Sequence, residues 1–195
     1  ISLGVQPRYS YLDVIHNFHR MDAELLESFL EEHATGVSLL AAPPVEEEAP
    51  PTPDQVVQLL RLCRRHFPNV VVDGGSRIRD LLVHALRESD ELLMVATPEI
   101  PTLRNLKRAQ NHLRLRGLNG AAPARIVLNQ AREGTGVAER EIREVLGEPV
   151  YVQIDRDDDS VLHSLNVGEP VGDAGRSRFA RGFARLGDKL LGAEE

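Results

Sequence analysis

The sequence predicts an α/β protein with three layers, in which a mostly parallel sheet carries helices on both faces. Apolar runs alternate five times with segments of helical periodicity, and such alternation is typical of parallel strands joined by helical crossovers. The runs are short and almost continuously apolar, as in strands that are buried on both faces. Aromatic residues make up only 4% of the chain and tryptophan is absent, so we expect an aliphatic core.

Capping and breaking residues set the limits of the expected elements. Thr52, Pro53 and Asp54 combine an N-cap, a proline at the first helical position and an acid in the first turn. Gly117 and Gly147 each end a helical pattern. We expect helices over residues 9–18, 23–33, 52–67, 77–88, 102–116, 137–146, 159–165 and 176–191. We expect strands over residues 37–41, 70–72, 92–96, 124–128 and 149–154.

Composition excludes several classes of protein. The 195 residues suit one domain, and a net charge of −7 argues against a generic nucleic-acid binder. One cysteine excludes a disulfide framework, and no apolar run approaches the roughly 20 residues of a membrane span. Only two of the 23 basic residues are lysines, and Leu106 and Asp188 precede them. A P-loop needs a glycine directly before its lysine, so the chain contains no P-loop.

Candidate site residues follow the predicted strands, because α/β sheets bind ligands at the carboxyl ends of their strands. Asp73 follows three valines and precedes Gly74 and Gly75, which allow the backbone to approach a ligand closely. This arrangement suits Mg²⁺ beside phosphates, and it equally suits an aspartate that caps the next helix. The sequence alone leaves both interpretations open.

Later strand ends carry further candidates. Asn129 has a side-chain amide that can read a base edge, or it can sit in a turn. Thr97 can bind a ligand or satisfy the loop backbone. The acidic run over residues 155–159 lacks the glycine and the distal glutamate of a calcium loop, which favours a solvated loop leading into a helix. The amphipathic segment 176–191 suits a packing helix with a basic outer face better than a helix on a membrane surface.

Five stretches form a joint pattern in collinear order: residues 3–14, 36–44, 70–73, 93–105, and 127–129 together with 150–170. In this pattern the chain resembles the MinD/ParA class of P-loop ATPases, most closely the CpaE/TadZ-like branch that serves Flp (tight-adherence) pilus assembly. The resemblance covers essentially the whole chain. No single motif is specific, and the order of the motifs carries the likeness.

The resemblance implies ATP and Mg²⁺ as ligands of the full-length protein. Asp73 matches the switch II (Walker B) aspartate, which holds Mg²⁺ through water, and Gly74 and Gly75 match the switch loop. Asn129 matches the asparagine that recognises adenine. The remaining matches are the loop that closes over the base (residues 154–161, with Asp155, Arg156 and Asp157) and a loop near the nucleotide-dependent dimer face (Thr97, Pro98, Glu99 and Thr102).

The chain also departs from the family pattern. Gly75 stands where relatives commonly have proline, and Asp155 replaces the proline of an Ile-Pro pair. The family's N-terminal strand, P-loop and helix are missing, and the chain opens with Ile1. We therefore expect residues 1–195 to be a single ATPase-like domain that lacks its P-loop portion and does not hydrolyse ATP alone.

The expected function belongs to the full-length protein. It would be a cytoplasmic ATPase that forms a homodimer through nucleotide and positions pilus or secretion machinery at the inner membrane or cell pole, with no specific nucleic acid. A non-catalytic localisation scaffold is the alternative, favoured by the missing lysine, Gly75 and Asp155. A phosphoacceptor receiver domain is disfavoured because Asn129 and Gln130 stand where it needs a lysine.

Overall fold

The computed structural model describes residues 4–43, 50–76, 78–118, 123–132, 137–171 and 177–192. The chain forms two compact units, which meet in sequence between Glu88 and Ser89. Within the described residues, no helix combines the length and the apolar character that crossing a bilayer requires.

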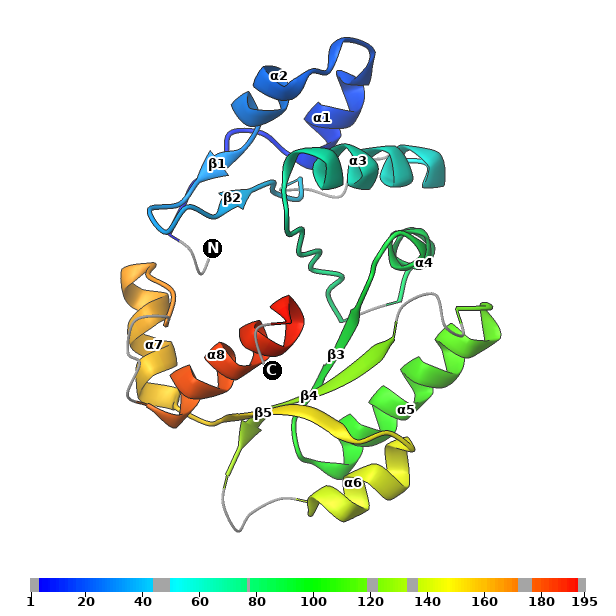
Figure 1. Cartoon of the computed structure of the whole chain (residues 1–195), viewed down its shortest axis with the longest axis vertical. Coiled ribbons are helices and arrows are strands. Elements are labelled where there is room, and N and C mark those ends of the chain that lie inside the picture. Colours follow the sequence, from blue (N-terminus) through cyan, green and yellow to red (C-terminus); the bar gives the residue numbers. More distant parts are fainter. Residues whose placement is uncertain are drawn as a thin grey trace. The chain divides into compact units, whose positions relative to one another are not determined.

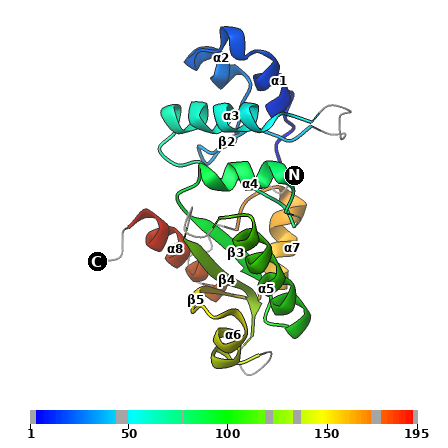
Figure 2. The ribbon, with the colours of Figure 1, turned by 90° about the vertical axis from the view of Figure 1, so that its right-hand side faces the viewer.

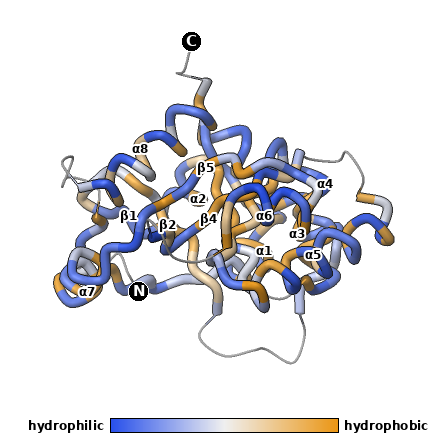
Figure 3. Tube along the Cα trace, turned by 90° about the horizontal axis from the view of Figure 1, so that it is seen from below, coloured by the Kyte–Doolittle hydropathy of each residue, from blue (hydrophilic) through white to orange (hydrophobic). Residues whose placement is uncertain are grey.

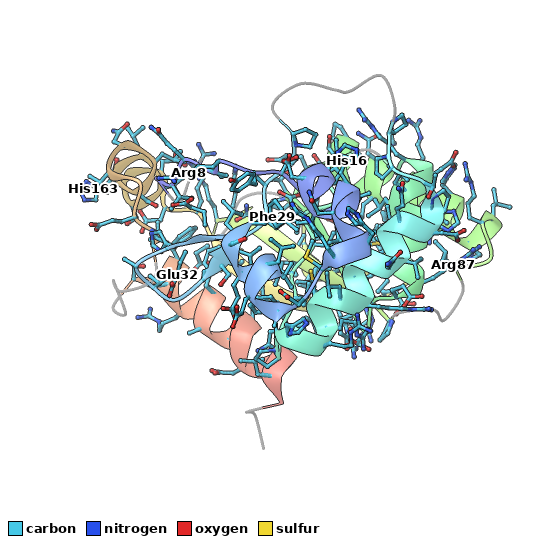
Figure 4. All side chains as sticks on the ribbon, turned by 90° about the horizontal axis from the view of Figure 1, so that it is seen from above. Arg8, His16, Phe29, Glu32, Arg87 and His163 are labelled. Carbon is cyan, nitrogen blue, oxygen red and sulfur yellow. The ribbon has the colours of Figure 1, made fainter. Side chains whose placement is uncertain are left out.

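Unit 1 is a small helical assembly with a two-stranded antiparallel hairpin (Figure 1). A hydrophobic cluster that includes Leu26, at 0% exposure, joins α1, α2 and α3. Phe29, labelled in Figure 4, belongs to this cluster, whereas His16 at the end of α1 is exposed. The elements are α1 (Tyr11–His16), a 3₁₀ helix (Phe18–Arg20), α2 (Ala23–Ser28), β1 (Glu31–Glu32), β2 (Ser38–Leu39), α3 (Pro53–His66) and α4 (Asp80–Arg87).

Side-chain caps fix the starts of the unit 1 helices. The Thr52 hydroxyl accepts a hydrogen bond from the Gln55 N–H, and the Gln55 side chain accepts one from the Thr52 N–H, as a capping box requires. Ser10 and Asp13 form the same motif at α1, with 2.7 Å between the Ser10 nitrogen and Asp13 Oδ2. These hydrogen bonds lower the pKa of Asp13, chiefly through the Ser10 backbone N–H.

Two predicted strands of unit 1 differ from the structure. Residues 37–41 do not form a buried parallel strand, because only Ser38 and Leu39 pair, and they pair antiparallel with β1. Residues 70–72 form no strand, and Val71 is 94% exposed. The predicted helix over residues 23–33 ends at Ser28, where the chain turns into the hairpin. Strand formation needs a pairing partner, which an apolar run alone does not reveal.

Unit 2 contains a parallel sheet in the order β3-β4-β5, which confirms the α/β class with helices flanking a parallel sheet. Figures 1 and 2 both show α8 on one side of the sheet and α5 on the other. The elements are β3 (Leu92–Ala96), α5 (Ile100–Leu115), β4 (Ala124–Ala131), α6 (Glu139–Leu146), β5 (Val150–Asp155), α7 (Asp158–Val167) and α8 (Arg178–Leu191).

The core of unit 2 is aliphatic, as the composition predicts. Leu103 and Ile126 are fully buried, and Figure 3 shows hydrophobic colour along β4 and alternating colours along the helices. On the α8 side, Phe179 packs against Val127 and neighbouring apolar residues of β5. Helix α8 approaches β5 closely at Gly182, where a Cβ atom would lie 3.1 Å from the Ile154 Cα.

Both lysines of the chain hold elements of unit 2 together. Lys107 Nζ on α5 donates a hydrogen bond to the Leu146 carbonyl at the end of α6, at 2.8 Å. Lys189 Nζ on α8 donates to the Tyr151 carbonyl in β5 at 3.2 Å and lies 5.1 Å from the centre of the Tyr151 ring. A cation near the last carbonyls of a helix is favourable, so Lys107 stabilises the C-terminus of α6.

Candidate functional site

The carboxyl ends of the three parallel strands meet at one edge of the unit 2 sheet. Ala96 lies opposite Leu128, and Ala131 lies opposite Asp155 in the strand register. The loop after β5 is tied to β4, because the Arg156 N–H donates to the Ala131 carbonyl at 2.9 Å. Predicted site residues from three strand ends therefore share this edge.

A cavity of about 300 Å³ opens at this edge. It is formed by the end of β4, the loop between β5 and α7, and the first turn of α8. Its polar and charged lining surrounds one buried aromatic side chain, that of Phe179. The lining residues are Ala131, Arg132, Asp155, Arg156, Asp157, Arg178 and Phe179.

Ion pairs organise the charged side chains at the cavity. Arg156 Nε lies 2.7 and 2.8 Å from the two carboxylate oxygens of Asp158, and Arg132 lies 3.8 Å from Asp158. The hydrogen bond from Arg156 lowers the pKa of Asp158, and the same contact raises the pKa of Arg156. Glu99, the residue before α5, adds a smaller attraction that also raises the pKa of Arg156. Arg156 therefore stays charged and lies among carboxylates.

Asp157 caps helix α7. Its Oδ1 accepts a hydrogen bond from the Ser160 N–H at 3.1 Å, and its Oδ2 accepts one from the Ser160 hydroxyl at 2.7 Å. Both oxygens thus fix the conformation of the loop, as the interpretation of an acidic loop leading into a helix predicts. Asp155, by contrast, is half-buried, and its carboxylate has no hydrogen bond or ion pair within the described residues.

The loop after β3 forms a local hydrogen-bonded turn. The Thr97 hydroxyl hydrogen-bonds the Glu99 carboxylate and lies 3.1 Å from Thr102 Oγ1. The Pro98 carbonyl accepts a hydrogen bond from the Val137 N–H at 3.2 Å. These contacts satisfy the loop itself, which is the structural alternative considered for Thr97. They leave the predicted dimer-face role of these residues a proposal.

Asn129 lies within a strand, because β4 extends to Ala131 beyond the predicted end at residue 128. Its Oδ1 accepts a hydrogen bond from the Gln130 N–H at 2.9 Å, and Gln130 has a positive φ of 57°. The register shifts between Leu128 and Ala131. The residues that line the cavity in the described part of unit 2 do not include Asn129.

Asp73 belongs to unit 1, together with Gly74 and Gly75. Its Oδ1 accepts a hydrogen bond from the Gly75 N–H at 2.8 Å, which forms an Asx turn, and Gly75 has a φ of 65°. A Cβ at Gly74 would lie 2.7 Å from a methyl carbon of Leu82. Asp73 is exposed, so a carboxylate oxygen can face a hydrated cation. The described residues contain no group of three or more His, Cys, Asp or Glu side chains placed to hold a metal.

Sequence reasoning missed three polar or aromatic lining residues: Arg132, Arg178 and Phe179. Arg132 follows the unpredicted extension of β4. Arg178 and Phe179 reach the cavity because α8 packs on β5, which is a tertiary contact. The one available signal was the apolar periodicity of α8, which places Phe179 on its packing face.

Comparisons with known proteins agree with this architecture. No family model matches the chain. A putative septum site-determining protein MinD of Tupiella akineta is 27% identical over 177 residues, covering 87% of this chain and 56% of the relative. MinD of Bacillus subtilis is 23% identical over 199 residues, covering 98% of this chain and 72% of the relative. The chain therefore spans between about half and three quarters of these relatives.

Solved structures show the same fold. A ParA family ATPase from Chlorobium tepidum matches with a TM-score of 0.83 and 24% identity, covering 96% of this chain and 76% of that protein. MinD of Pyrococcus horikoshii complexed with Mg-ADP matches with a TM-score of 0.76 and 20% identity, covering the whole of this chain and 79% of that protein. The sequence relatives and the shared fold together support a relationship with the MinD/ParA-type P-loop ATPases.

Proposed function

We propose that the chain is the greater part of a MinD/ParA-type ATPase domain that binds Mg-ATP in the full-length protein. The observation that carries this proposal is the cavity at the carboxyl edge of the unit 2 sheet, lined by the loop after β5. Parallel α/β sheets bind ligands at this edge. Residues 1–195 would then be one domain whose P-loop strand and helix lie outside the chain.

Candidate residues of unit 1 and of unit 2 suit different parts of Mg-ATP. Mg²⁺ takes one or two carboxylates together with phosphate oxygens and water, so the exposed Asp73 carboxylate suits a water-mediated contact, and the Asp73–Gly75 turn orients it. Bound Mg²⁺ would neutralise charge on the phosphates. The loop of Asp155, Arg156 and Asp157 would close over the base, held by the cap on α7 and the tie to β4.

We propose roles for Asn129 and for the Thr97–Thr102 turn from their positions in the sheet. Asn129 would approach the base from the neighbouring strand β4 after rotation of its side chain away from the Gln130 N–H. The Thr97–Thr102 turn would contribute to a nucleotide-dependent dimer face at the same sheet edge. Both roles are supported by position near the carboxyl ends of parallel strands.

Isothermal titration calorimetry of ATP with Mg²⁺ tests the proposal on the full-length protein. We expect Asp73→Ala to lower the affinity for Mg-ATP at least tenfold, since the metal contact is lost. Asp54→Ala, which removes an exposed carboxylate from the first turn of α3, is the matched control and should leave the affinity unchanged. Equal affinity in wild type and Asp73→Ala would reject the role of Asp73.

We also propose a cellular role for the full-length protein. The resemblance favours positioning of pilus-assembly machinery on the cytoplasmic side of the inner membrane or at a cell pole, whereas the matched relatives are named for septum-site determination. Localisation of a fluorescent fusion in cells with and without pilus genes separates these roles. A pattern that follows the division septum and ignores the pilus genes would reject the pilus role.

A non-catalytic scaffold is the second candidate. It is favoured by Gly75 and Asp155, which replace prolines of the family pattern, and by the absence of a Gly-Lys pair in the chain. A scaffold would keep the sheet and its surfaces but would not turn over ATP. Release of phosphate by the full-length protein, lost in Asp73→Ala and kept in Asp54→Ala, would reject the scaffold.

A further inference from the structure

Helix α5 presents a cationic outward face in unit 2. Four of its 16 residues are arginine or lysine and none is acidic, in a protein whose net charge is −7. Arg104 and Arg108, one turn apart, are exposed and have no hydrogen bond or ion pair within the described residues. Leu115, two turns after Arg108, is 88% exposed. This face of α5 therefore combines unpaired cations with an apolar end.

Helix α7 carries the opposite charge beside exposed apolar side chains. Its ten residues all lie in the described part of the chain, and none of them is buried. Asp159 is exposed and has no hydrogen bond or ion pair there, whereas Asp158 pairs with Arg156. Leu162 and Leu165 are 59% and 55% exposed. A helix this short is marginal in water unless its apolar side chains pack, so burial of this face would stabilise α7.

The faces of α5 and α7 match in charge and in spacing. In each helix the unpaired charged residue stands nearer the N-terminus than the exposed leucine. At a rise of about 1.5 Å per residue, Arg108 and Leu115 lie about 10 Å apart along the axis of α5. Asp159 and Leu165 lie about 9 Å apart along α7 by the same rise, with Leu162 between them. Two such helices packed side by side in parallel would therefore bring the opposite charges together and the leucines together.

We propose that α7 of one chain docks on α5 of a second copy of the same chain. Within one chain the two helices lie apart in unit 2 (Figure 1), so α7 does not cover α5 of its own chain. The contact needs no nucleotide and therefore does not rest on the proposed binding of Mg-ATP. A contact between two different faces is heterologous, so a pair of chains still offers one uncovered α5 and one uncovered α7. Self-association should thus continue beyond the dimer.

The surroundings of α5 favour a short acidic helix over a broad anionic surface. Helix α6 packs against α5, since Lys107 on α5 donates a hydrogen bond to the Leu146 carbonyl. Three exposed glutamates lie on α6: Glu139, Glu141 and Glu144. A membrane surface or duplex nucleic acid that reached the cations of α5 would also meet these carboxylates, and like charges repel. A ten-residue helix with one acidic end can contact α5 alone.

Sedimentation velocity of the chain without nucleotide, over a range of protein concentrations in low and high salt, tests the proposal. A single pair of helices makes a small and weak interface, so we expect self-association at high protein concentration. Arg108→Glu and Asp159→Arg should each lower the association constant about tenfold, because an attraction becomes a repulsion. High salt should weaken the association of the wild-type chain by screening the same charges.

A mixture of the two variants identifies the pairing. Equal amounts of Arg108→Glu and Asp159→Arg chains should recover the wild-type association, because each variant keeps the helix that is altered in the other. The double variant should recover it within one chain, because the reversed charges attract. Arg65→Glu and Asp54→Arg make the same charge changes on exposed residues of α3 and should leave the association unchanged. Circular dichroism of every variant, matching that of the wild-type chain, shows that the fold is retained.

Each outcome decides for or against the contact. A wild-type chain that stays monomeric at every concentration would overturn it, and so would single variants that associate like the wild type. Loss of association in both variants without recovery in the mixture would overturn the pairing of α5 with α7. Cosedimentation of the chain with phosphatidylglycerol vesicles, lost in Arg108→Glu, would assign α5 to an anionic lipid surface instead. Recovery in the mixture and in the double variant would support the proposal.

Discussion

Two short apolar segments of the same chain reach opposite structural outcomes. In unit 2, Val127 lies in β4 between two parallel neighbours and is 2% exposed. In unit 1, Val71 lies in an unpaired segment and is 94% exposed. Residues 70–72 and residues 126–128 are both continuous runs of three apolar residues. The difference shows that an apolar run encodes the capacity to form a strand, and that a pairing partner decides whether the strand forms.

Truncation of Val127 and of Val71 to alanine tests this comparison. The difference between the two changes in the free energy of unfolding should be the largest effect. Val127→Ala removes two methyl groups from the sheet core and should lower the free energy of unfolding by about 2 kcal/mol. Val71→Ala should change it by less than about 0.5 kcal/mol, because the side chain is already in solvent. Urea denaturation followed by circular dichroism measures both. Similar losses in the two variants would show that residues 70–72 are buried in solution.

A second test concerns the close packing of α8 on β5 in unit 2. A Cβ at Gly182 would press on the backbone of β5, 3.1 Å from the Ile154 Cα and 3.2 Å from the Gln153 carbonyl oxygen. Gly182→Ala should therefore destabilise the chain by about 1 kcal/mol, even though alanine favours helix.

Gly187 in the same helix is the matched control. A Cβ there meets nothing within 4 Å, so Gly187→Ala should stabilise the chain by up to about 1 kcal/mol through helix propensity alone. Thermal unfolding of the two variants measures the pair. Stabilisation by both substitutions would contradict the close packing of α8 on β5.

The smallest expected effect concerns the capping box of unit 1. Hydrogen bonds from Ser10 lower the pKa of Asp13 below its usual value of 3.8. A lowered folded-state pKa means that the carboxylate stabilises the fold above pH 3.8 and that this contribution disappears as the pH falls through the folded-state pKa. Ser10→Ala should cost about 0.5 to 1 kcal/mol at neutral pH.

Titration of Asp13 by carboxyl-detected NMR checks the sign. In the wild-type chain its pKa should lie below 3.8, and in Ser10→Ala it should return toward that value, because both the hydroxyl donor and the cap geometry change. Because the Ser10 N–H remains in the variant, only part of the shift should be lost, and an Asp13 pKa that is the same in both proteins would show that the Ser10 hydroxyl does not hydrogen-bond Asp13.

The sequence predicted unit 2 better than unit 1 because the apolar runs of unit 2 form paired strands, whereas the run at residues 70–72 of unit 1 forms none. The run at residues 92–96 was placed correctly, and the parallel sheet follows from alternation with helices. The hairpin of β1 and β2 was missed because Glu31 and Glu32 carry no strand pattern and pair only across a turn. The extension of β4 past Asn129 depends on a register shift, which local sequence does not encode.

The candidate site was also predicted in part. Asp155, Arg156 and Asp157 line the cavity that the structure places at the predicted sheet edge. Arg178 and Phe179 come from a helix that is distant in sequence, so only the packing of α8 brings them there. The role of Asp73 remains a prediction, because it lies in the other unit and its carboxylate forms a local turn.

The two lysines of the chain have a practical consequence. Each ammonium group donates to a backbone carbonyl of a different element in unit 2, Lys107 to the end of α6 and Lys189 to β5. An amine in such a contact must leave it before an acylating reagent can react. Peptide mapping after brief acylation thus provides two separate reporters of local opening, one for the α5–α6 side of the sheet and one for the α8 side, without any engineered label.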